Sequence, residues 1–312
     1  MIKRIQNKVA ESRYTLPAAA AYGVVVWLVG GLIQQQWWIQ FACFAIATYL
    51  MVELNNSNAL IRIYSRSVSA IFIVLSCVAS FLFPSIEGAI TQVCLAASLL
   101  FLFRSYQDKK AAGLTFYAFL FLSIGSLTHV LTLWFIPVYW IIMVFFIYSM
   151  SIRTFVASLL GFLLPYWCLF TWVLWRYGDD LILFTQHFEP LGDYYVDATT
   201  LSLPLMLTFA FIVVLSITGL IHYLRTSFMD NIRIRQIYYS FIFLDAVSAV
   251  FLILQPQQYD IILRMMIIAT SPLIAHFISL TRTRFTNIAF FAILGVALIL
   301  TVFNLWISLF SS

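Results

Sequence analysis

Charged side chains are scarce in this sequence. Asp, Glu, Lys and Arg together make up 9% of the 312 residues, whereas apolar residues make up 63%. Typical soluble domains carry charge on about a quarter of their residues, so this chain has too little polar surface for water. The composition excludes a soluble globular protein and predicts that lipid covers much of the surface.

Several signatures of catalysis and cross-linking are also absent. The sequence contains no P-loop and no G-x-G-x-x-G, H-E-x-x-H or G-x-S-x-G pattern, which leaves nucleotide hydrolysis, zinc proteolysis and Rossmann chemistry without support. Its four cysteines include no C-x-x-C pair, and all fall within apolar stretches. We therefore expect neither disulfide bonds nor a zinc site, and whether the protein is an enzyme stays open.

The sequence does contain many long apolar stretches. A membrane core about 30 Å thick takes roughly 20 apolar residues per helix, so we predict about eleven spans, within a range of ten to twelve. The predicted spans cover residues 17–34, 38–54, 67–84, 88–103, 113–130, 132–150, 154–175, 202–223, 237–255, 260–280 and 286–309. The predicted fold class is an all-α, polytopic transmembrane bundle that occupies residues 1–312 as a single membrane domain without a soluble domain. The count is weakest at 113–150, where the outer turn is very short.

The basic residues gather on one side of this predicted bundle. When the spans are threaded alternately, all but two of the 17 Lys and Arg residues fall on the same side as the N-terminus. The exceptions are Arg176, in the longest outer segment, and Arg264, inside the tenth span. By the positive-inside rule we predict a cytoplasmic N-terminus and an outer C-terminus for this multi-pass chain. The net charge of +5 then reflects topology and contact with lipid headgroups, and nucleic acid is not an expected partner.

One carboxylate is predicted at membrane depth. Asp245 falls near the middle of the ninth predicted span, where an ionised carboxylate costs several kcal/mol unless it faces protein, water or a partner. Two interpretations remain open. Asp245 either bonds to a neighbouring helix as a packing device, or acts as the coupling carboxylate of a transporter.

Arg264 lies about one helical turn inside the outer end of the tenth predicted span, and Asp260 precedes it by four residues on the same helix face. An ion pair with Asp260 would satisfy the guanidinium. The alternative is a substrate site, because a guanidinium just below the outer surface and between apolar walls suits a phosphate or a lipid pyrophosphate.

The longest outer segment, 176–200, is rich in acidic side chains. Its apolar part predicts a short interfacial helix that holds His187 and Glu189 over the membrane surface, where we expect them to contact a substrate. Asp193 and Asp197 follow, and we predict that one of them acts as a general base or metal ligand, although the sequence assigns no metal site. Simple solvation of these acids is the alternative.

The predicted cytoplasmic loop after the second span carries a polar cluster. We expect its asparagines to form a turn and a helix N-cap, before a helix that carries Arg62 and Arg66 on one face. The alternative is a gate or a site for lipid headgroups. The cluster comprises Glu53, Asn55, Asn56, Asn58 and Arg62.

Three further histidines, His129, His222 and His276, stand isolated near predicted span ends. We interpret each as a hydrogen-bonded helix residue rather than as a ligand.

Three segments resemble a known family. They are VELNNSNALIRIYSR at 52–66, RTFVASLLGFLLPYW at 153–167 and QYDIILRMMIIATSPLIAHFISLTRTR at 258–284. Over nearly its whole length the chain resembles an uncharacterised family of multi-pass inner-membrane proteins found mainly in Bacteroidetes-type bacteria. This resemblance implies a multi-pass location in a bacterial inner membrane and no particular chemistry.

In its architecture the chain also resembles membrane glycosyltransferases that use polyprenyl-phosphate sugars. The resemblance rests on the number of spans, the cytoplasmic N-terminus and the acids at the outer face. Those enzymes usually carry a catalytic acid in a sizeable first outer loop, whereas the corresponding loop here reads QQQWW and has none. This departure counts against direct membership of that class, and the outer segment 176–200 is the alternative place for the role.

These features support three functional hypotheses. The leading one is an inner-membrane protein of envelope biogenesis that handles a lipid-linked or otherwise anionic amphiphile at its outer face, with membrane lipids as partners. The second is an ion- or proton-coupled transporter of small molecules that uses Asp245. The third is a non-catalytic subunit of an envelope assembly complex, with a protein partner in the membrane. No cofactor follows from the sequence.

Overall fold

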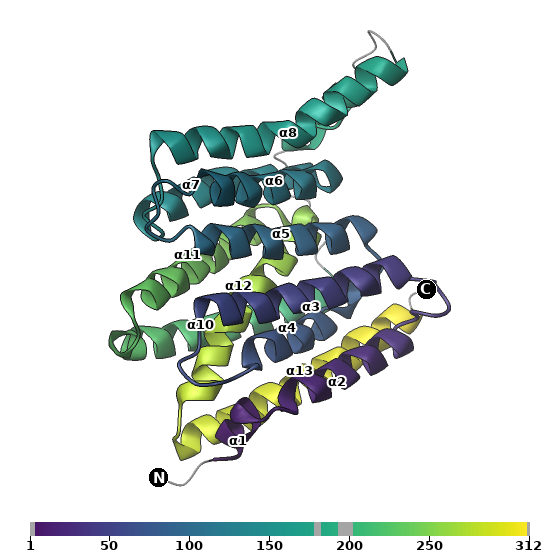
Figure 1. Ribbon diagram of the computed structural model, residues 1–312. Coiled ribbons are helices and arrows are strands. Elements are labelled where there is room, and N and C mark those ends of the chain that lie inside the picture. The colour runs from purple at the N-terminus through teal and green to yellow at the C-terminus, as the bar shows by residue number, and fades with distance from the viewer. Residues whose placement is uncertain (1–3, 178–181, 193–201, 311–312) are drawn as a thin grey trace.

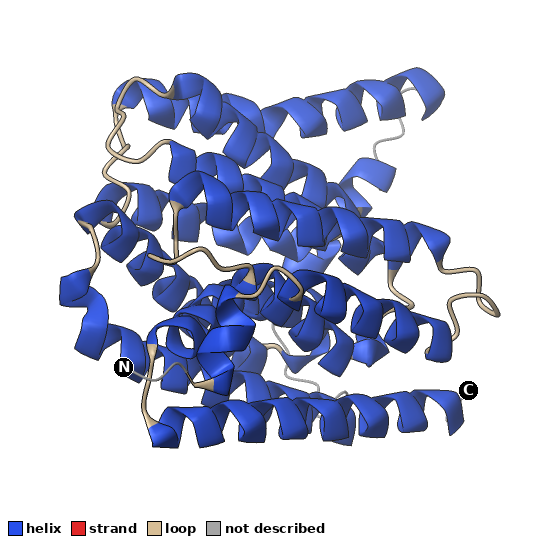
Figure 2. Cartoon of the chain, turned by 60° about the horizontal axis from the view of Figure 1, so that its bottom comes forward, coloured by secondary structure: helices blue, strands red, loops and turns tan. Residues whose placement is uncertain are grey.

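The structure is a computed structural model that describes residues 4–177, 182–192 and 202–310, and these residues form helices and connections without a strand. The helices of the first half are α1 (Ile5–Glu11), α2 (Thr15–Val29), α3 (Trp38–Asn58), α4 (Ser67–Val78), α5 (Ile86–Arg104), α6 (Ala112–Thr128) and α7 (Phe135–Phe145). Those of the second half are α8 (Ile152–Tyr177), α9 (Ile182–Gln186), α10 (Leu203–Thr226), α11 (Ile232–Leu254), α12 (Tyr259–Leu280) and α13 (Arg284–Phe310). The predicted all-α fold is confirmed for this part of the chain, as Figure 2 shows by colour.

Length divides the apolar helices into two groups. Among the described residues, seven are long and apolar enough to cross a membrane, at 38–58, 86–104, 152–176, 203–229, 232–254, 256–280 and 284–308. Four are shorter, at 15–29, 67–78, 112–128 and 130–145. At a rise of 1.5 Å per residue, the 12 residues of α4 span about 18 Å, well below the thickness of a membrane core. Each predicted span coincides with one of these helices, and the count of eleven crossings stays a prediction.

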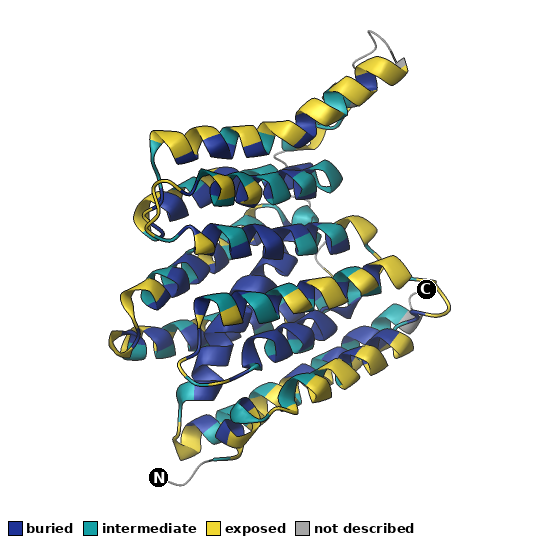
Figure 3. Ribbon diagram, viewed as in Figure 1, coloured by how far each residue is buried: buried dark blue, intermediate teal, exposed yellow. Residues whose placement is uncertain are grey.

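Helix α12 lies at the centre of the bundle (Figure 1). It packs against α1, α4, α5, α10 and α11, and all its residues from Ile261 to Ser279 are buried (Figure 3). A helix enclosed by other helices has neither a water face nor a lipid face. Polar side chains on α12 must therefore find their partners inside the protein.

The other helices extend from this centre in two directions (Figure 1). On one side α6 packs against α5, and α8 packs against α6; on the other side lie α2 and α13. Gly161 permits the close contact between α6 and α8, because a Cβ at this position would overlap the Phe116 carbonyl oxygen. The outer faces of α8 and α13 expose large apolar side chains such as Leu160 and Ile299, which fits contact with lipid.

The asparagines Asn55, Asn56 and Asn58 lie at the end of α3, so they end a helix and do not begin one. Asn58 is the last residue of α3, and Ala59 follows in the left-handed conformation with φ of +49°. The Asn55 side chain donates to the Ser65 carbonyl oxygen at 3.0 Å, which holds the returning chain against the helix end. Segment 60–66 is not helical. The prediction of an N-cap and of a helix that carries both arginines is therefore wrong.

Candidate functional site

Arg264 is the centre of a polar cluster near the start of α12. The helix begins at Tyr259, directly after the 3-10 turn η6 (Pro256–Gln258). Because Asp260 and Arg264 are four residues apart, their side chains share one helix face, and Arg264 Nε lies 2.8 Å from Asp260 Oδ1. The ion pair considered for these two residues is present.

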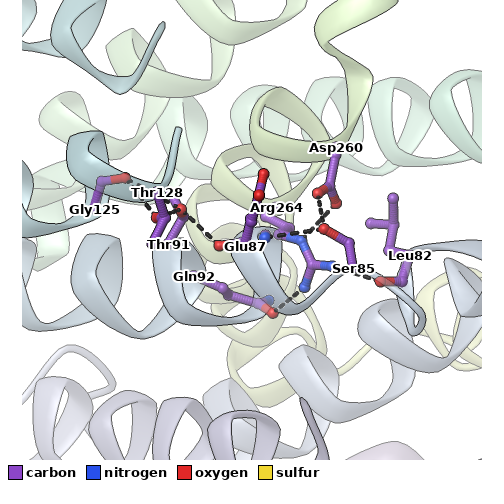
Figure 4. A network of polar contacts seen from close by, with 10 residues as sticks. Leu82, Ser85, Glu87, Thr91, Gln92, Gly125, Thr128, Asp260 and Arg264 are labelled. Carbon is purple, nitrogen blue, oxygen red and sulfur yellow. Dashed lines mark hydrogen bonds and ion pairs between the residues drawn. The ribbon is translucent and has the colours of Figure 1, made fainter. Parts of the chain in front are cut away.

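The other guanidinium contacts come from α5 and from the turn before it (Figure 4). Arg264 Nη1 donates to Gln92 Oε1 at 3.0 Å, and Nη2 donates to the Leu82 carbonyl oxygen at 2.6 Å. The residue is only 5% exposed. A buried guanidinium needs an opposite charge and filled hydrogen bonds, and this one has both. Arg264 therefore fixes α12 to α5, and phosphate binding by Arg264 stays a prediction.

Ser85 connects this ion pair to the start of α5. Its hydroxyl donates to Asp260 Oδ2 at 2.6 Å and accepts a hydrogen bond from the Gly88 backbone N–H at 2.9 Å, so Ser85 is the N-cap of the helix. A Cβ at position 88 would overlap Asp260 Oδ2 and lie 2.7 Å from Arg264 Nε. The close approach of α5 to α12 therefore requires glycine here. We call Ser85, Gln92, Asp260 and Arg264 the Arg264 cluster.

Two titratable side chains border the Arg264 cluster. Glu87 in the first turn of α5 is exposed, and His129 at the end of α6 is half-buried. Burial lowers the pKa of the His129 imidazole from its ordinary value of 6.5; the carboxylates of Asp260 and Glu87 oppose this decrease, and the Arg264 guanidinium adds to it. His129 is therefore a neutral imidazole near pH 7, able to accept a hydrogen bond or a proton.

Hydrogen bonds between α5 and α6 hold His129 at this place. The hydroxyl oxygens of Thr91 and Thr128 lie 2.9 Å apart, and Thr91 Oγ1 also donates to the Gly125 carbonyl oxygen at 3.3 Å (Figure 4). Such contacts replace water for polar groups at membrane depth. They fix the end of α6 beside the start of α5.

An apolar cavity of about 370 Å³ lies beside the Arg264 cluster. It is enclosed by η2 (Val130–Trp134), the start of α7, the end of α11 and the start of α12, and we call it the η2–α12 cavity. Its lining residues are Leu131, Trp134, Phe135, Phe251, Leu254, Gln255, Gln258, Ile261 and Ile262. The cavity and the cluster share the first turn of α12, because Asp260 directly precedes two of these residues. The volume falls within the usual range for small-molecule sites.

Segment 182–192 reaches the same end of the molecule. Turn η3 (Glu189–Leu191) packs against η2, which lines the η2–α12 cavity. His187 Nε2 lies 3.5 Å from the Tyr166 hydroxyl, which in turn lies 2.7 Å from Ser126 Oγ, and Glu189 is exposed. The structure thus places both predicted contact residues near the cavity, and their contact with a substrate stays a prediction.

The predicted base residues, Asp193 and Asp197, lie outside the described residues. Within the described part of the chain, no group of three or more His, Cys, Asp or Glu side chains is arranged to hold a metal ion. The role of a base therefore stays a prediction for both aspartates.

Asp245 lies in a separate buried environment on α11. It is 2% exposed, and Thr270 Oγ1 of α12 donates to its Oδ2 at 3.0 Å. The bond to a neighbouring helix that the packing interpretation required is present. A coupling role stays a prediction.

The polar residues at the end of α3 and in the connection that follows it contact separate partners. The contacts are Glu53 Oε1 to Arg104 Nη2 at 2.6 Å, Asn58 Oδ1 to Arg233 Nη2 at 3.1 Å and Arg62 Nε to Asp230 Oδ1 at 2.7 Å. Asn55 holds the returning chain, as described above, and Asn56 is exposed. These contacts join α3 and its loop to α5 and α11, and a gate or headgroup site in this cluster stays a prediction.

Sequence reasoning missed a buried contact between Asp230 and His276. His276 Nε2 lies 3.1 Å from Asp230 Oδ2, and neither side chain is exposed. The rings of His222 and His276 lie 5.3 Å apart between centroids. The description of these two histidines as isolated is therefore wrong, whereas His276 is indeed a hydrogen-bonded helix residue. No spacing pattern connects the pair, because the two residues are 46 positions apart in the sequence.

The comparisons with known proteins provide no relative. No protein-family model matches the chain, and no curated protein and no solved structure shows significant similarity to it. The class therefore rests on the helices. Seven helices long and apolar enough to cross a membrane define a helical membrane protein.

Proposed function

We propose that this protein binds a lipid-linked amphiphile at the outer face of a bacterial inner membrane. The observation that carries the proposal is the apolar η2–α12 cavity of about 370 Å³ beside the Arg264 cluster. An apolar chain fits against walls such as Phe251 and Ile262, while a polar group meets Glu87 and His129 at the border of the cluster. An apolar cavity with a few convergent polar groups is the usual form of a ligand site.

The charges near this cavity favour a hydroxyl-rich polar group over an anionic one. Arg264 is paired with Asp260, His129 is neutral near pH 7, and Glu87 presents an exposed carboxylate. The Glu87 carboxylate is therefore the one unbalanced charge among these groups, and it repels an anion. A sugar or another polyol linked to a lipid instead offers hydroxyl donors that Glu87 and His129 accept. We therefore narrow the substrate class from anionic amphiphiles to lipid-linked polyols.

The location follows from the proposed topology. With eleven crossings and a cytoplasmic N-terminus, nearly all Lys and Arg residues lie on the inner side. The turn between α11 and α12, which contains no basic residue, then lies on the outer side together with the η2–α12 cavity. A lipid-linked polyol handled there belongs to the assembly of the cell envelope.

Native mass spectrometry of protein extracted from its own membrane tests the proposal. We expect a retained amphiphile with the mass of a glycosylated or polyol lipid, and loss of that mass in Ile262→Phe and Leu131→Phe, which fill the η2–α12 cavity. Ile299→Phe on the lipid-facing side of α13 is the matched control, since this residue is 69% exposed. Equal retention by the wild type and both cavity variants would overturn the proposal.

A proton-coupled transporter is the second candidate, and the position of Asp245 favours it. This carboxyl is buried on α11 and accepts a hydrogen bond from Thr270 of α12, and an ionisable group inside a membrane is often functional. In sealed vesicles we expect a pH gradient to drive solute uptake that Asp245→Asn abolishes. Proton flux unchanged by this substitution would contradict coupling through Asp245.

A further inference from the structure

A second apolar cavity, of about 330 Å³, lies between α2 and α13 on one side and α4, α10 and α12 on the other. We call it the α2–α13 cavity. Its walls include Ala19 of α2, Ala70 of α4, Ile278 of α12 and Ile293 of α13. The cavity is partly open to the surface of the bundle, so the protein itself leaves these apolar walls uncovered. In a membrane, the acyl chains of lipids surround the protein and can fill this cavity.

Helix α1 brings positive charge to one end of this cavity. Val9 and Ala10 of α1 are part of the lining. Lys8 immediately precedes them, and its side chain is exposed. The end of the cavity formed by α1 is therefore bordered by a cation that is free to reach a headgroup.

The connection between α12 and α13 is held at the same end. Gln6 Nε2 donates to Thr281 Oγ1 at 2.9 Å, and Asn7 Nδ2 donates to the Thr281 carbonyl oxygen at 2.9 Å. These contacts tie α1 to a segment in which Arg282 and Arg284 are exposed. Basic side chains from two distant parts of the sequence thus border one cavity.

The charge of this end is strongly positive. Segments 4–15 and 279–286 contain five basic residues and one acidic residue, Glu11. Clusters of Lys and Arg next to an apolar surface attract anionic headgroups. A helix of a partner protein does not fit the cavity, because a helix with its side chains is about 10 Å across.

From the apolar walls and the basic border together, we propose that the α2–α13 cavity is a binding site for an anionic phospholipid. One acyl chain fills the cavity between α2, α4, α12 and α13. The phosphate of the headgroup contacts Lys8 and Arg284. The site is independent of the lipid-linked polyol proposed for the η2–α12 cavity and lies at the basic end of the molecule.

The test uses purified full-length protein in nanodiscs of phosphatidylcholine with a minor fraction of phosphatidylglycerol. After release of the protein, native mass spectrometry counts the retained lipids of each kind. We expect one phosphatidylglycerol per wild-type protein. The double variant Lys8→Gln/Arg284→Gln retains it about tenfold less, because two cations near the headgroup are lost. Lys110→Gln/Arg153→Gln removes two exposed cations away from the cavity and retains it fully.

A cavity-filling variant separates the acyl-chain contact from the charge. Ala19→Phe, on the half-buried face of α2, excludes the chain, so retention of phosphatidylglycerol falls while all the cations remain. The proposal is overturned if both double variants lose phosphatidylglycerol equally, or if folded Ala19→Phe, verified by its unfolding temperature, retains it fully. Ile262→Phe in the other cavity leaves this retention unchanged, so a failure of either proposal is distinguishable from a failure of the other.

Discussion

Gly88 is the position at which one added methyl group does most harm to the Arg264 cluster. A Cβ there would overlap Asp260 Oδ2 and lie 2.7 Å from Arg264 Nε. We expect Gly88→Ala to lower the free energy of unfolding by about 1–3 kcal/mol, because α5 and α12 must move apart or the ion pair must break. Thermal unfolding in mild detergent measures this effect.

Gly113 in α6 offers a matched control, because a Cβ there meets nothing within 4 Å. Gly113→Ala is expected to be neutral or to stabilise by up to about 1 kcal/mol, as alanine is the better helix former. Equal unfolding temperatures for the two alanine variants would contradict the packing described for Gly88.

His129 makes stability depend on pH. Burial lowers its pKa in the folded protein below the ordinary value of 6.5, so the unfolded chain takes up a proton first as the pH falls. The contribution of the neutral His129 imidazole to the free energy of unfolding is therefore complete above pH 6.5. It is lost as the pH falls through the lowered pKa. We expect the unfolding temperature of His129→Gln to decrease less than that of the wild type between pH 7.5 and pH 5.

Two further variants serve as a comparison and a control in the pH experiment. The pKa of His187 is also lowered by burial, so a variant that lacks both histidines should show a still smaller dependence. Asn56→Gln changes an exposed residue and should behave like the wild type. A pH profile that His129→Gln leaves unchanged would mean that the imidazole is not buried in the folded protein.

At the scale of the helices, polar side chains on apolar helices hold the bundle together. Asn304 of α13 donates through Nδ2 to the Val78 carbonyl oxygen at 2.6 Å and to Thr208 Oγ1 at 2.9 Å. It thereby joins α13 to the end of α4 and to α10. A hydrophobic effect between helices is largely missing in lipid, so contacts of this kind contribute to helix association.

We expect Asn304→Ala to cost about 1–2 kcal/mol and to loosen α13 first, because hydrogen bonds between membrane helices have about this strength. Limited proteolysis of the C-terminal helix, together with thermal unfolding, measures both effects. Asn56→Ala is the matched control, since Asn56 is exposed at the end of α3. Equal protection of α13 in both variants would contradict the contact.

The apolar stretches predicted the positions of the helices well, because each stretch is much longer than the turns that separate them. They predicted the turn at 59–66 poorly. Asparagine occurs both at helix N-caps and at the C-terminal ends of helices, and the choice here depends on the Ser65 carbonyl oxygen, which Asn55 meets only in the folded protein.

At the scale of the whole molecule, either the seven long helices alone or all eleven apolar helices cross the membrane. Seven helices are long enough to cross by themselves, and four shorter apolar helices accompany them. We expect the four to cross as well, because the basic residues are then almost all on one side. Short helices can cross by local thinning of the bilayer or by continuing into their flanking turns.

Labelling of single cysteines with a membrane-impermeant reagent decides the topology. In a cysteine-free background, we expect Lys110→Cys to react only from the cytoplasmic side and Gln35→Cys only from the outer side. Labelling of both positions from one side would contradict the crossing of α3 and its neighbours in the predicted order. The third functional hypothesis, a subunit of an envelope complex, predicts in addition that apolar positions on α8 become protected when a partner binds.

The sequence by itself determined the class of this protein and the places of its helices. Both follow from local composition, because a stretch of about 20 apolar residues can satisfy its backbone in lipid only as a helix. Only the tertiary structure decided that Arg264 also donates to Gln92 and to the Leu82 carbonyl oxygen, and that His276 meets Asp230. These contacts join residues far apart in the chain, and the packing of α5, α11 and α12 brings them together without any pattern in the sequence that records it.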